Sequence, residues 1–246
     1  MRNTVDILGV PIDNITMEQA LLKVKEFLSD GKSHAIYTPN SEFIMNAQRD
    51  EEFKNILCQS DLCIPDGAGV VLASKILGRR LCEKVSGIDL VKNSFSMMPD
   101  RKLKYFFLGS KPGVAETAAR NVMAEYKNVE VVGCMHGYFS KEEEPDVVKK
   151  ISESNADILL VALGQKKQEK FIHDHKDELN VKVSIGVGGT INILAGEATL
   201  APDFFRRNGL EWFYRLCKEP KRFVRMLDLP RFMIRVIKVK LLPSRS

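Results

Sequence analysis

"ADILLVALGQKKQEKFIHDHKDELNVKVSIGVG", residues 156–188, is the stretch that decides the fold of this chain of 246 residues. It contains two apolar runs, 156–164 and 181–188, which both finish in glycine and are separated by a charged, helix-like segment. Comparable apolar runs, with segments of helical periodicity between them, occupy residues 4–10, 34–38, 62–64, 104–109 and 129–134. This repeated alternation predicts a mostly parallel, Rossmann-like α/β sheet with helices on both faces.

The helical segments carry local start signals. Thr16 and Gln19 have the spacing of a capping box, and apolar residues follow on one helical face. Pro112 suits the first turn of a helix, which predicts a helix from there through Tyr126. A further helix is expected over about 142–154. Such helices supply the crossover connections that parallel strands need.

The expected strand ends share a composition that bears on function, because ligands of parallel sheets bind beyond the carboxyl ends of the strands. Glycine or small polar residues occupy these ends at 38–40, 65–67, 109–110, 136–138, 164–165 and 186–190. Glycine lets backbone N–H groups approach an anion, although it also simply suits a turn. Taken together, the ends favour a phosphate-bearing ligand. The candidate binding residues among them are Thr38, Asn40, Gly109, Tyr138, Gly188, Gly189 and Thr190.

Asp66 is the candidate for chemistry among the acids near strand ends. It lies between Pro65 and Gly67, and we expect this turn to project its carboxylate into the crevice beside Thr38 and Asn40. A carboxylate held there can take a proton from an attacking hydroxyl group, which typically contributes a factor of about 10²–10⁴ in rate. The same spacing suits an ordinary turn residue, so both interpretations stay open at this point.

Positive charge is concentrated toward the carboxyl terminus. Residues 202–246 contain 12 Lys and Arg against 4 Asp and Glu, whereas residues 1–201 contain 25 against 28. We therefore expect an α/β catalytic domain over 1–201 and a basic helical appendage over 202–246, where an anionic partner is met. Prolines at positions 220, 230 and 243 are expected to divide the appendage into short helices.

The last helix of this appendage is amphipathic, with basic residues on one side of a helical wheel and apolar residues on the other. The basic set is Arg231, Arg235 and Lys238, and the apolar set is Met233, Val236, Ile237 and Val239. Such a helix is typical of one that lies on an anionic membrane surface. Two alternatives stay open: a helix docked on the body with its charges in solvent, and a surface that completes a homo-oligomer.

Several features predict a cytoplasmic protein. No apolar run approaches the ~20 residues that a membrane-spanning helix needs. The first residues, MRNTVDILGVPID, lack a secretory pattern, and the 5 cysteines are an odd number without a Cys-x-x-Cys motif. Reduced thiols in the cytoplasm are the simplest interpretation.

Several common chemistries lack their motifs in this sequence. It contains no Gly-x-x-x-x-Gly-Lys-Ser/Thr loop, no Gly-x-Gly-x-x-Gly and no Asp-x-Asp, the usual divalent-metal clamp on a nucleotide diphosphate. His173 and His175 fall on different faces of a helix, so a metal pair is not expected there. We expect neither a metal nor an organic cofactor, with arginine, lysine and helix ends neutralising any diphosphate. A nucleic-acid-binding module and a nicotinamide-dependent oxidoreductase remain as alternatives, although the body is acidic and the dinucleotide fingerprint is absent.

Five segments together resemble the TagA/WecG/CpsF family of bacterial glycosyltransferases. They are YTPNSEFI (37–44), IPDGAGVV (64–71), VALGQKKQEKFI (161–172), GVGGTINILAG (186–196) and NGLEWFYRLCKEPKRFVR (208–225). The segments occur in the family's order over about residues 5–225, and the last block is the most specific of them.

The resemblance implies an activity. This is the transfer of N-acetylmannosamine from its UDP donor to N-acetylglucosamine linked to undecaprenyl diphosphate, an early step of wall teichoic acid synthesis. The reaction implied is an inverting one without a metal ion. The carboxyl-terminal segment is implied to reach the inner face of the bacterial plasma membrane and to close over the active site. Family members move other sugars as well, so a different UDP-sugar donor is the alternative.

The resemblance also implies roles for individual residues. Asp66 corresponds to the family's proposed general base, while Thr38 and Asn40 match the polar pair of its Thr-Pro-Asn motif. Gln168 matches a motif glutamine. The basic residues implied to hold diphosphate are Arg215, Arg222 and Arg225.

Two positions depart from the family pattern. Lys166 stands where proline is usual, which we expect to loosen the turn before Gln168. Asn192 stands where aspartate is common, so it can contact a donor only through neutral hydrogen bonds. Neither departure involves Asp66.

Overall fold

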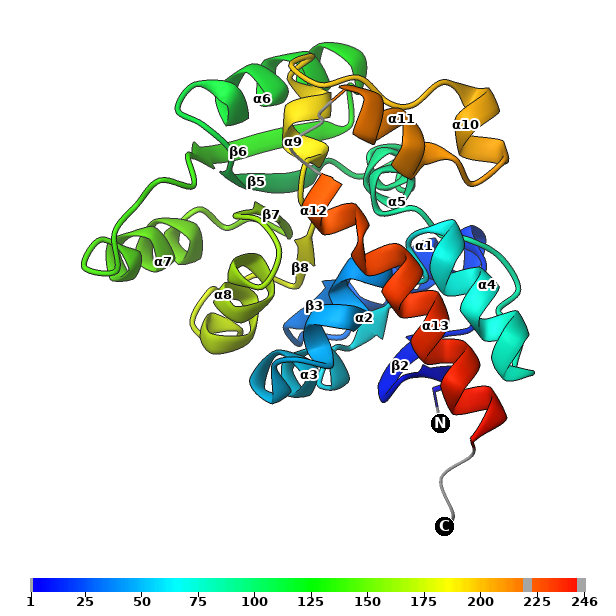
Figure 1. The fold of residues 1–246 in the computed structure, drawn as a ribbon. Coiled ribbons are helices and arrows are strands. Elements are labelled where there is room, and N and C mark those ends of the chain that lie inside the picture. Colours follow the sequence, from blue (N-terminus) through cyan, green and yellow to red (C-terminus); the bar gives the residue numbers. More distant parts are fainter. Residues whose placement is uncertain (1, 219–222, 243–246) are drawn as a thin grey trace.

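The computed structural model describes residues 2–218 and 223–242. Its centre is a six-stranded sheet in the order β4-β3-β8-β7-β5-β6, in which every pairing is parallel (Figure 1). The strands are β3 (His34–Tyr37), β4 (Leu62–Cys63), β5 (Leu103–Gly109), β6 (Val129–Met135), β7 (Ile158–Ala162) and β8 (Val183–Gly186). The α/β fold expected from the sequence is therefore confirmed.

Helices cover both faces of this sheet, because side chains alternate between the faces along each strand. In β5, Phe106 and Leu108 join one core while Tyr105 and Phe107 join the other. The first core is completed by α2 (Ser41–Ala47), α3 (Glu51–Cys58), α4 (Ala68–Leu77), α7 (Glu144–Glu153) and α8 (Lys167–His175). The second core is completed by α1 (Met17–Phe27), α5 (Gly87–Ser94), α6 (Val114–Glu125) and α9 (Thr190–Leu194).

Two of the expected helix starts differ in outcome. The capping box is confirmed, since Thr16 Oγ1 accepts from Gln19 N and Gln19 Oε1 accepts from Thr16 N. The helix expected from Pro112 instead begins at Val114. Gly113 caps this helix and has a φ of 84°, in the left-handed region. Pro112 therefore lies before the helix and not in its first turn.

The first apolar run, 4–10, does not join the parallel sheet. It forms β1 (Thr4–Ile7) and the start of β2 (Val10–Asp13), which pair antiparallel as a separate two-stranded sheet. Leu8 and Gly9 both have positive φ, which reverses the chain in a tight hairpin. Asp6 supports this turn by accepting a hydrogen bond from Gly9 N.

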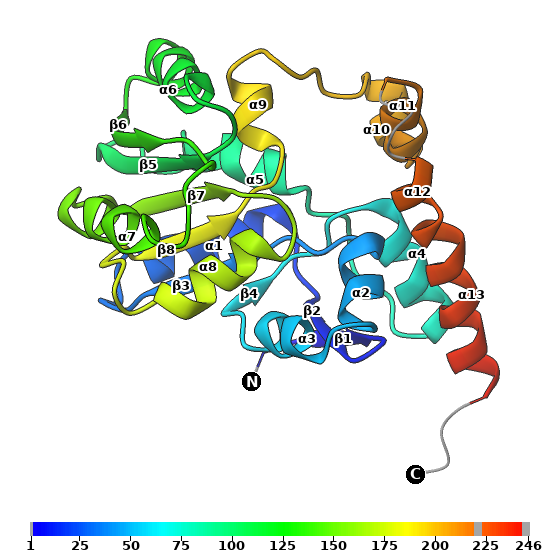
Figure 2. The same cartoon turned by 60° about the vertical axis from the view of Figure 1, so that its left-hand side comes forward.

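The carboxyl-terminal appendage, which we call the tail, packs on the body. Its helices are α10 (Asp203–Arg207), α11 (Glu211–Lys218), α12 (Phe223–Met226) and α13 (Asp228–Leu241). In Figures 1 and 2, α13 lies alongside α4, and it also contacts α2. Phe232 and Val236 are completely buried in this contact, and Arg49 forms an ion pair with Asp228. Among the expected chain breaks, Pro230 lies in the first turn of α13, which tolerates proline, while positions 220 and 243 fall outside the described residues.

Docking of α13 corrects the apolar face expected from its sequence. Val236 is buried against the body and Met233 is half-buried, whereas Ile237 and Val239 are 43% and 47% exposed. The predicted apolar residues are therefore divided between the buried side of α13 and its exposed side, because the position of α4 decides which side is covered. None of the helices in 2–218 and 223–242 is long and apolar enough to cross a membrane.

Candidate active site

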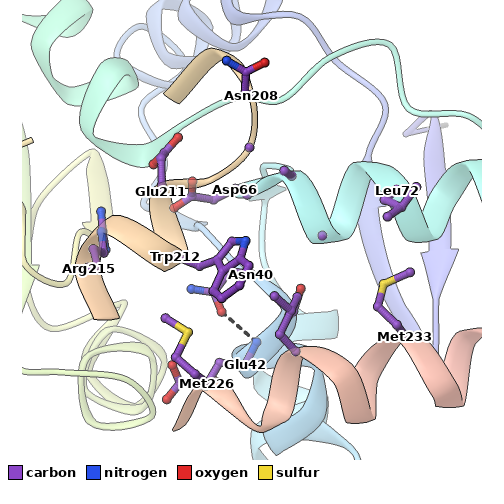
Figure 3. A pocket seen from close by; sticks show the side chains of 16 residues that line it. Asn40, Glu42, Asp66, Leu72, Asn208, Glu211, Trp212, Arg215, Met226 and Met233 are labelled. Atoms are coloured by element: carbon purple, nitrogen blue, oxygen red, sulfur yellow. Dashed lines mark hydrogen bonds between the residues drawn. The ribbon is translucent and has the colours of Figure 1, made fainter. Parts of the chain in front are cut away.

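A cavity of about 430 Å³ lies beyond the carboxyl ends of β3 and β4, between the body and the tail (Figure 3). Its polar lining comes from Asn40, Glu42, Asp66, Asn208, Glu211 and Arg215. Its apolar lining includes Leu72, Trp212, Met226, Leu229 and Met233. The crevice expected beyond the strand ends is therefore present at one end of the sheet, with the tail as its second wall.

Asp66 is fixed by the turn that joins β4 to α4. Asp66 N donates to Ile64 O at 2.9 Å, and Val85 N donates to Pro65 O at 3.0 Å. Gly67, with φ of 106°, then directs the chain into α4. This rigid turn leaves the Asp66 carboxylate on the cavity wall, as predicted.

The surroundings of Asp66 change its acidity. Burial, and to a smaller extent the nearby Glu211 carboxylate, raise its pKa, whereas Arg215, Lys84 and the Gly87 N–H oppose the rise, and the net result is a pKa of about 6. A carboxylate with a pKa just below neutrality is ionised at neutral pH and is a stronger base than an ordinary aspartate. This is the property required of a group that takes a proton from a hydroxyl.

The tail is held at the cavity by ion pairs and by one close contact. Glu211 pairs with Lys84, and Arg206 pairs with Asp89 at 2.7 Å. The turn between α10 and α11 passes over the start of α4, where a Cβ on Gly209 would lie only 2.7 Å from Ala68 Cβ. Neither Glu211 nor Lys84 was among the predicted site residues. The only signal for Glu211 was its place in the Gly-Leu-Glu-Trp block.

Asn40 combines a structural contact with a place on the cavity wall. Its Oδ1 accepts from Glu42 N at 2.9 Å and Phe43 N at 3.2 Å, and so caps α2. The side-chain amide N–H groups have no partner among the described residues. Thr38 lies deeper, is buried, and donates from Oγ1 to Gly186 O at 3.2 Å. It therefore supports the site from behind and does not line the cavity.

Gln168 is likewise a supporting residue. It is 1% exposed, and its Oε1 accepts from Gly188 N at 3.1 Å while its Nε2 donates to Glu169 Oε1 at 2.6 Å. Glu169 Oε2 accepts from Lys166 N at 2.8 Å, and Lys166 Nζ pairs with Asp50. The backbone of Lys166 has a φ of 70°, a value that proline cannot adopt, and its N–H donates to Glu169, so this turn differs from the one that a proline would form.

The remaining predicted residues lie at or beyond the carboxyl ends of other strands, outside the cavity. Gly188 and Gly189 precede α9, Thr190 is buried at its start, and Asn192 Oδ1 is buried without a hydrogen-bond partner among the described residues. Gly109 packs so closely on β7 that a Cβ would lie 2.3 Å from Ala162 O, which gives this glycine a packing role. Tyr138 is 68% exposed beyond β6, at the other end of the sheet from Asp66.

The three predicted arginines have different positions. Arg215 lies on α11 and lines the cavity. Arg225 belongs to α12, and Arg222 lies outside the described residues. Within 2–218 and 223–242, no cluster of three or more His, Cys, Asp or Glu side chains is arranged to hold a metal ion.

Comparison with known proteins gives these features a context. The model of the Glycosyl transferase WecG/TagA/CpsF family matches residues 5–246. A protein of Bacillus subtilis strain 168 is 33% identical over 236 residues, covering 96% of this chain and 91% of that protein. A protein of Staphylococcus aureus strain MRSA252 is 34% identical over 238 residues, covering 96% and 93%. Both are named N-acetylglucosaminyldiphosphoundecaprenol N-acetyl-beta-D-mannosaminyltransferase.

A third relative, from Bacillus spizizenii strain W23, carries the same name and is 35% identical over 213 residues, covering 86% of this chain and 82% of that protein. The family match extends through both the sheet that carries Asp66 and the tail that carries Arg215. The chain therefore belongs to the WecG/TagA/CpsF family of glycosyltransferases.

Proposed function

We propose that this protein transfers N-acetylmannosamine from UDP-N-acetylmannosamine to N-acetylglucosamine on undecaprenyl diphosphate, with inversion and without a metal ion, in wall teichoic acid synthesis. The observation that carries the proposal is Asp66, a carboxylate with a raised pKa that lines a cavity together with Arg215. The names of the relatives support this donor sugar and this acceptor. The alternative is another UDP-sugar with the same acceptor.

In the proposed reaction, Asp66 takes the proton from a hydroxyl group of the acceptor sugar. The resulting oxygen nucleophile forms a bond to the anomeric carbon of the donor, and the bond from that carbon to the UDP oxygen breaks. The bonding electrons leave with UDP, so charge passes from the carboxylate to the departing diphosphate. A single displacement of this kind inverts the anomeric centre.

The departing diphosphate needs positive charge near the reacting atoms, and preorganised charge is usually the largest catalytic contribution. Arg215 supplies a guanidinium at the cavity. The first turn of α4, which has no side-chain cap and whose Ala68 and Gly69 line the cavity, supplies backbone N–H groups. Arg222 and Arg225 are proposed to complete this charge. These groups take the part that a metal ion plays in other transferases.

The donor is proposed to bind beyond β8, β7 and β5, next to the cavity. Asn192 supports this placement, since its buried Oδ1 has no partner among the described residues and can accept from a ligand. Gln168 and Thr38 are proposed to shape this site by holding Gly188 and Gly186. The remaining residues proposed to contact the donor are Gly109, Tyr138, Gly189 and Thr190.

The tail, residues 202–246, is proposed to act as the active-site lid on the catalytic domain, residues 1–201, and to bind the anionic membrane surface at the cytoplasmic face. On α13, Ile234, Ile237 and Leu241 are exposed, and basic residues flank them. Ile237→Asp is therefore expected to weaken binding to vesicles of anionic lipid. Leu22→Asp, which changes an exposed leucine of α1, is the control. Equal vesicle binding by the two variants would contradict a membrane role for α13.

The proposed reaction is tested by measuring UDP release with a panel of UDP-sugars and a soluble N-acetylglucosamine diphospholipid. We expect UDP-N-acetylmannosamine to give the highest turnover, a β-linked product by NMR, and an unchanged rate in EDTA. Higher turnover with another UDP-sugar would show that this other sugar is the donor. If EDTA abolished the activity and Mg²⁺ restored it, the proposal that the reaction needs no metal ion would be wrong.

A further inference from the structure

The cavity is amphipathic along its length. Figure 3 shows Asp66, Glu211 and Arg215 toward one end, and Leu72 and Met233 facing one another at the other. The polar end lies at the start of α4, whereas Leu72 is further along that helix, about 6 Å beyond Ala68 at the usual rise per residue. A ligand that fills the whole cavity therefore has a charged part and an apolar part.

The apolar end is walled by two helices that belong to different parts of the chain. Leu72 comes from α4 of the body, and Leu229 and Met233 come from α13 of the tail. The helices lie close together at Gly69, where a Cβ would lie 3.2 Å from Leu229 Cδ1. One turn further along each helix, Leu72 and Met233 line the cavity, and Met233 also packs against the core.

The wall formed by Leu72, Leu229 and Met233 is an apolar surface whose side chains cannot form hydrogen bonds with a ligand. Leu72 is 48% exposed, although it lies between two packed helices. Aliphatic and thioether groups provide no hydrogen bonds for a uracil base or a sugar, but they suit a flexible hydrocarbon chain, to which methionine adapts readily. The chemistry of the wall therefore favours an alkyl or isoprenoid group.

The apolar wall also continues out of the cavity. Met233, Ile237 and Leu241 follow at intervals of four residues, so they form one stripe along α13. Ile237 and Leu241 are 43% and 73% exposed. The stripe leads from the cavity toward the end of the helix that the proposed function places on the membrane.

We propose that the gap between α4 and α13, walled by Leu72, Leu229 and Met233, binds the first isoprenoid units of the acceptor lipid. This subsite rests on the proposed function, because it requires a diphosphate-linked lipid whose sugar reaches Asp66. The diphosphate then lies between Arg215 and the apolar wall. The rest of the lipid chain follows the stripe of α13 to the membrane.

The test compares two soluble acceptors that share the N-acetylglucosamine diphosphate headgroup, one carrying a farnesyl chain and one a methyl group. The assay uses the full chain below the critical micelle concentration and without membranes, so that membrane binding does not enter the result. Because each buried methylene contributes roughly 0.8 kcal/mol, wild-type KM is expected to be at least about tenfold lower for the farnesyl acceptor. Equal KM values for the two acceptors would overturn the subsite.

Leu72→Ser and Met233→Ser are expected to raise the farnesyl KM about five- to tenfold while leaving the methyl KM and the donor KM unchanged. Leu22→Ser is the matched control, because Leu22 is 51% exposed on α1 and Leu72 is 48% exposed on α4. A rise in both acceptor KM values, or the same change in the control, would overturn the subsite.

A second measurement separates this inference from the proposed function. A farnesyl diphosphate that carries a benzophenone group is cross-linked to the wild-type protein, and the labelled peptides are mapped. Labelling within 68–77 and 228–241 supports the subsite, and labelling elsewhere overturns it. If no UDP-sugar is transferred to either acceptor, the proposed reaction fails, and this map still decides whether the gap binds an isoprenoid chain.

Discussion

Two turns at the carboxyl ends of strands each hold a carboxyl group whose pKa burial has raised, and they differ in what surrounds it. Asp66 follows β4 and has a pKa of about 6, while Glu169 follows β7 and has a pKa of about 7. Asp66 faces a cavity with Arg215 and Glu211 nearby. Glu169 is completely buried and accepts hydrogen bonds from Gln168 and the backbone of Lys166.

The difference shows that a raised pKa does not by itself identify a catalytic acid or base. Burial is the largest cause of the shift in both groups. Asp66 lines the cavity, whereas Glu169 is completely buried and both of its oxygens accept hydrogen bonds. We therefore expect Asp66 to govern turnover and Glu169 to govern stability.

The largest expected effect is on turnover. Asp66→Asn keeps the size of the side chain but cannot take a proton at neutral pH, so kcat/KM is expected to fall by about 10²–10⁴. Steady-state UDP release measures the loss, and circular dichroism checks that the fold is kept. Turnover near the wild-type rate would remove Asp66 from the mechanism.

The corresponding change at the other turn is expected to act on the free energy of unfolding. Glu169→Ala leaves Lys166 N and Gln168 Nε2 without their acceptor and opens a small void, which together cost about 2–4 kcal/mol. Thermal melting is expected to show a Tm lower by roughly 5–15 °C. If Asp66→Asn lowered Tm as much as Glu169→Ala, the proposed division between the turns would be wrong.

Arg215 distinguishes the surroundings of the two carboxyl groups. Arg215→Gln removes a charge from the cavity and is expected to reduce kcat/KM about 10- to 100-fold, which corresponds to the loss of roughly 1.5–3 kcal/mol from a charged hydrogen bond. Lys218→Gln is the control, because Lys218 is an exposed cation on the same helix that does not line the cavity. Equal effects of the two substitutions would leave Arg215 as a surface charge.

The pH dependence gives the smallest effect and has opposite signs for turnover and stability. Since the carboxylate of Asp66 is the active form, kcat/KM is expected to fall about tenfold between pH 7 and pH 5, through the pKa of about 6. Because the folded pKa lies above the ordinary 3.8, folding favours the protonated form. The stabilisation that this gives is complete below about pH 4 and is lost as pH rises through about 6. If kcat/KM did not increase between pH 5 and pH 7, the role of Asp66 as a base would be contradicted.

The sheet, its strand ends and the turn that places Asp66 at the cavity could be predicted from the sequence because they depend on local patterns. Alternating apolar runs specify strands, and Pro65 and Gly67 specify a turn. The pairing of Glu211 with Lys84 joins residues far apart in the chain, so no local pattern could indicate it. The close packing of Gly109 on Ala162 was also hidden, because a sequence does not show which backbone a glycine approaches.

The helix faces of the tail could be predicted only in part. The wheel of α13 separates basic from apolar residues, but the covered side is set by α4 and α2, which lie more than a hundred residues away in the sequence. Phe232 and Val236 are therefore buried while Ile237 of the same helix is exposed. The cavity between α4 and α13 follows from this docking and has no counterpart in either helix alone.

The two halves of the tail are attached by different forces. Phe232 and Val236 anchor α13 in the core, whereas no residue of α10 (203–207) or α11 (211–218) is buried, and the ion pairs of Arg206 and Glu211 link these helices to the body. Salt screens exposed ion pairs and leaves apolar burial in place or strengthens it. The ion pairs that hold α10 and α11 are partly buried, so salt screens them only in part. Rising ionic strength is therefore expected to weaken the attachment of α10 and α11 over Asp66 more than the packing of α13 on α4.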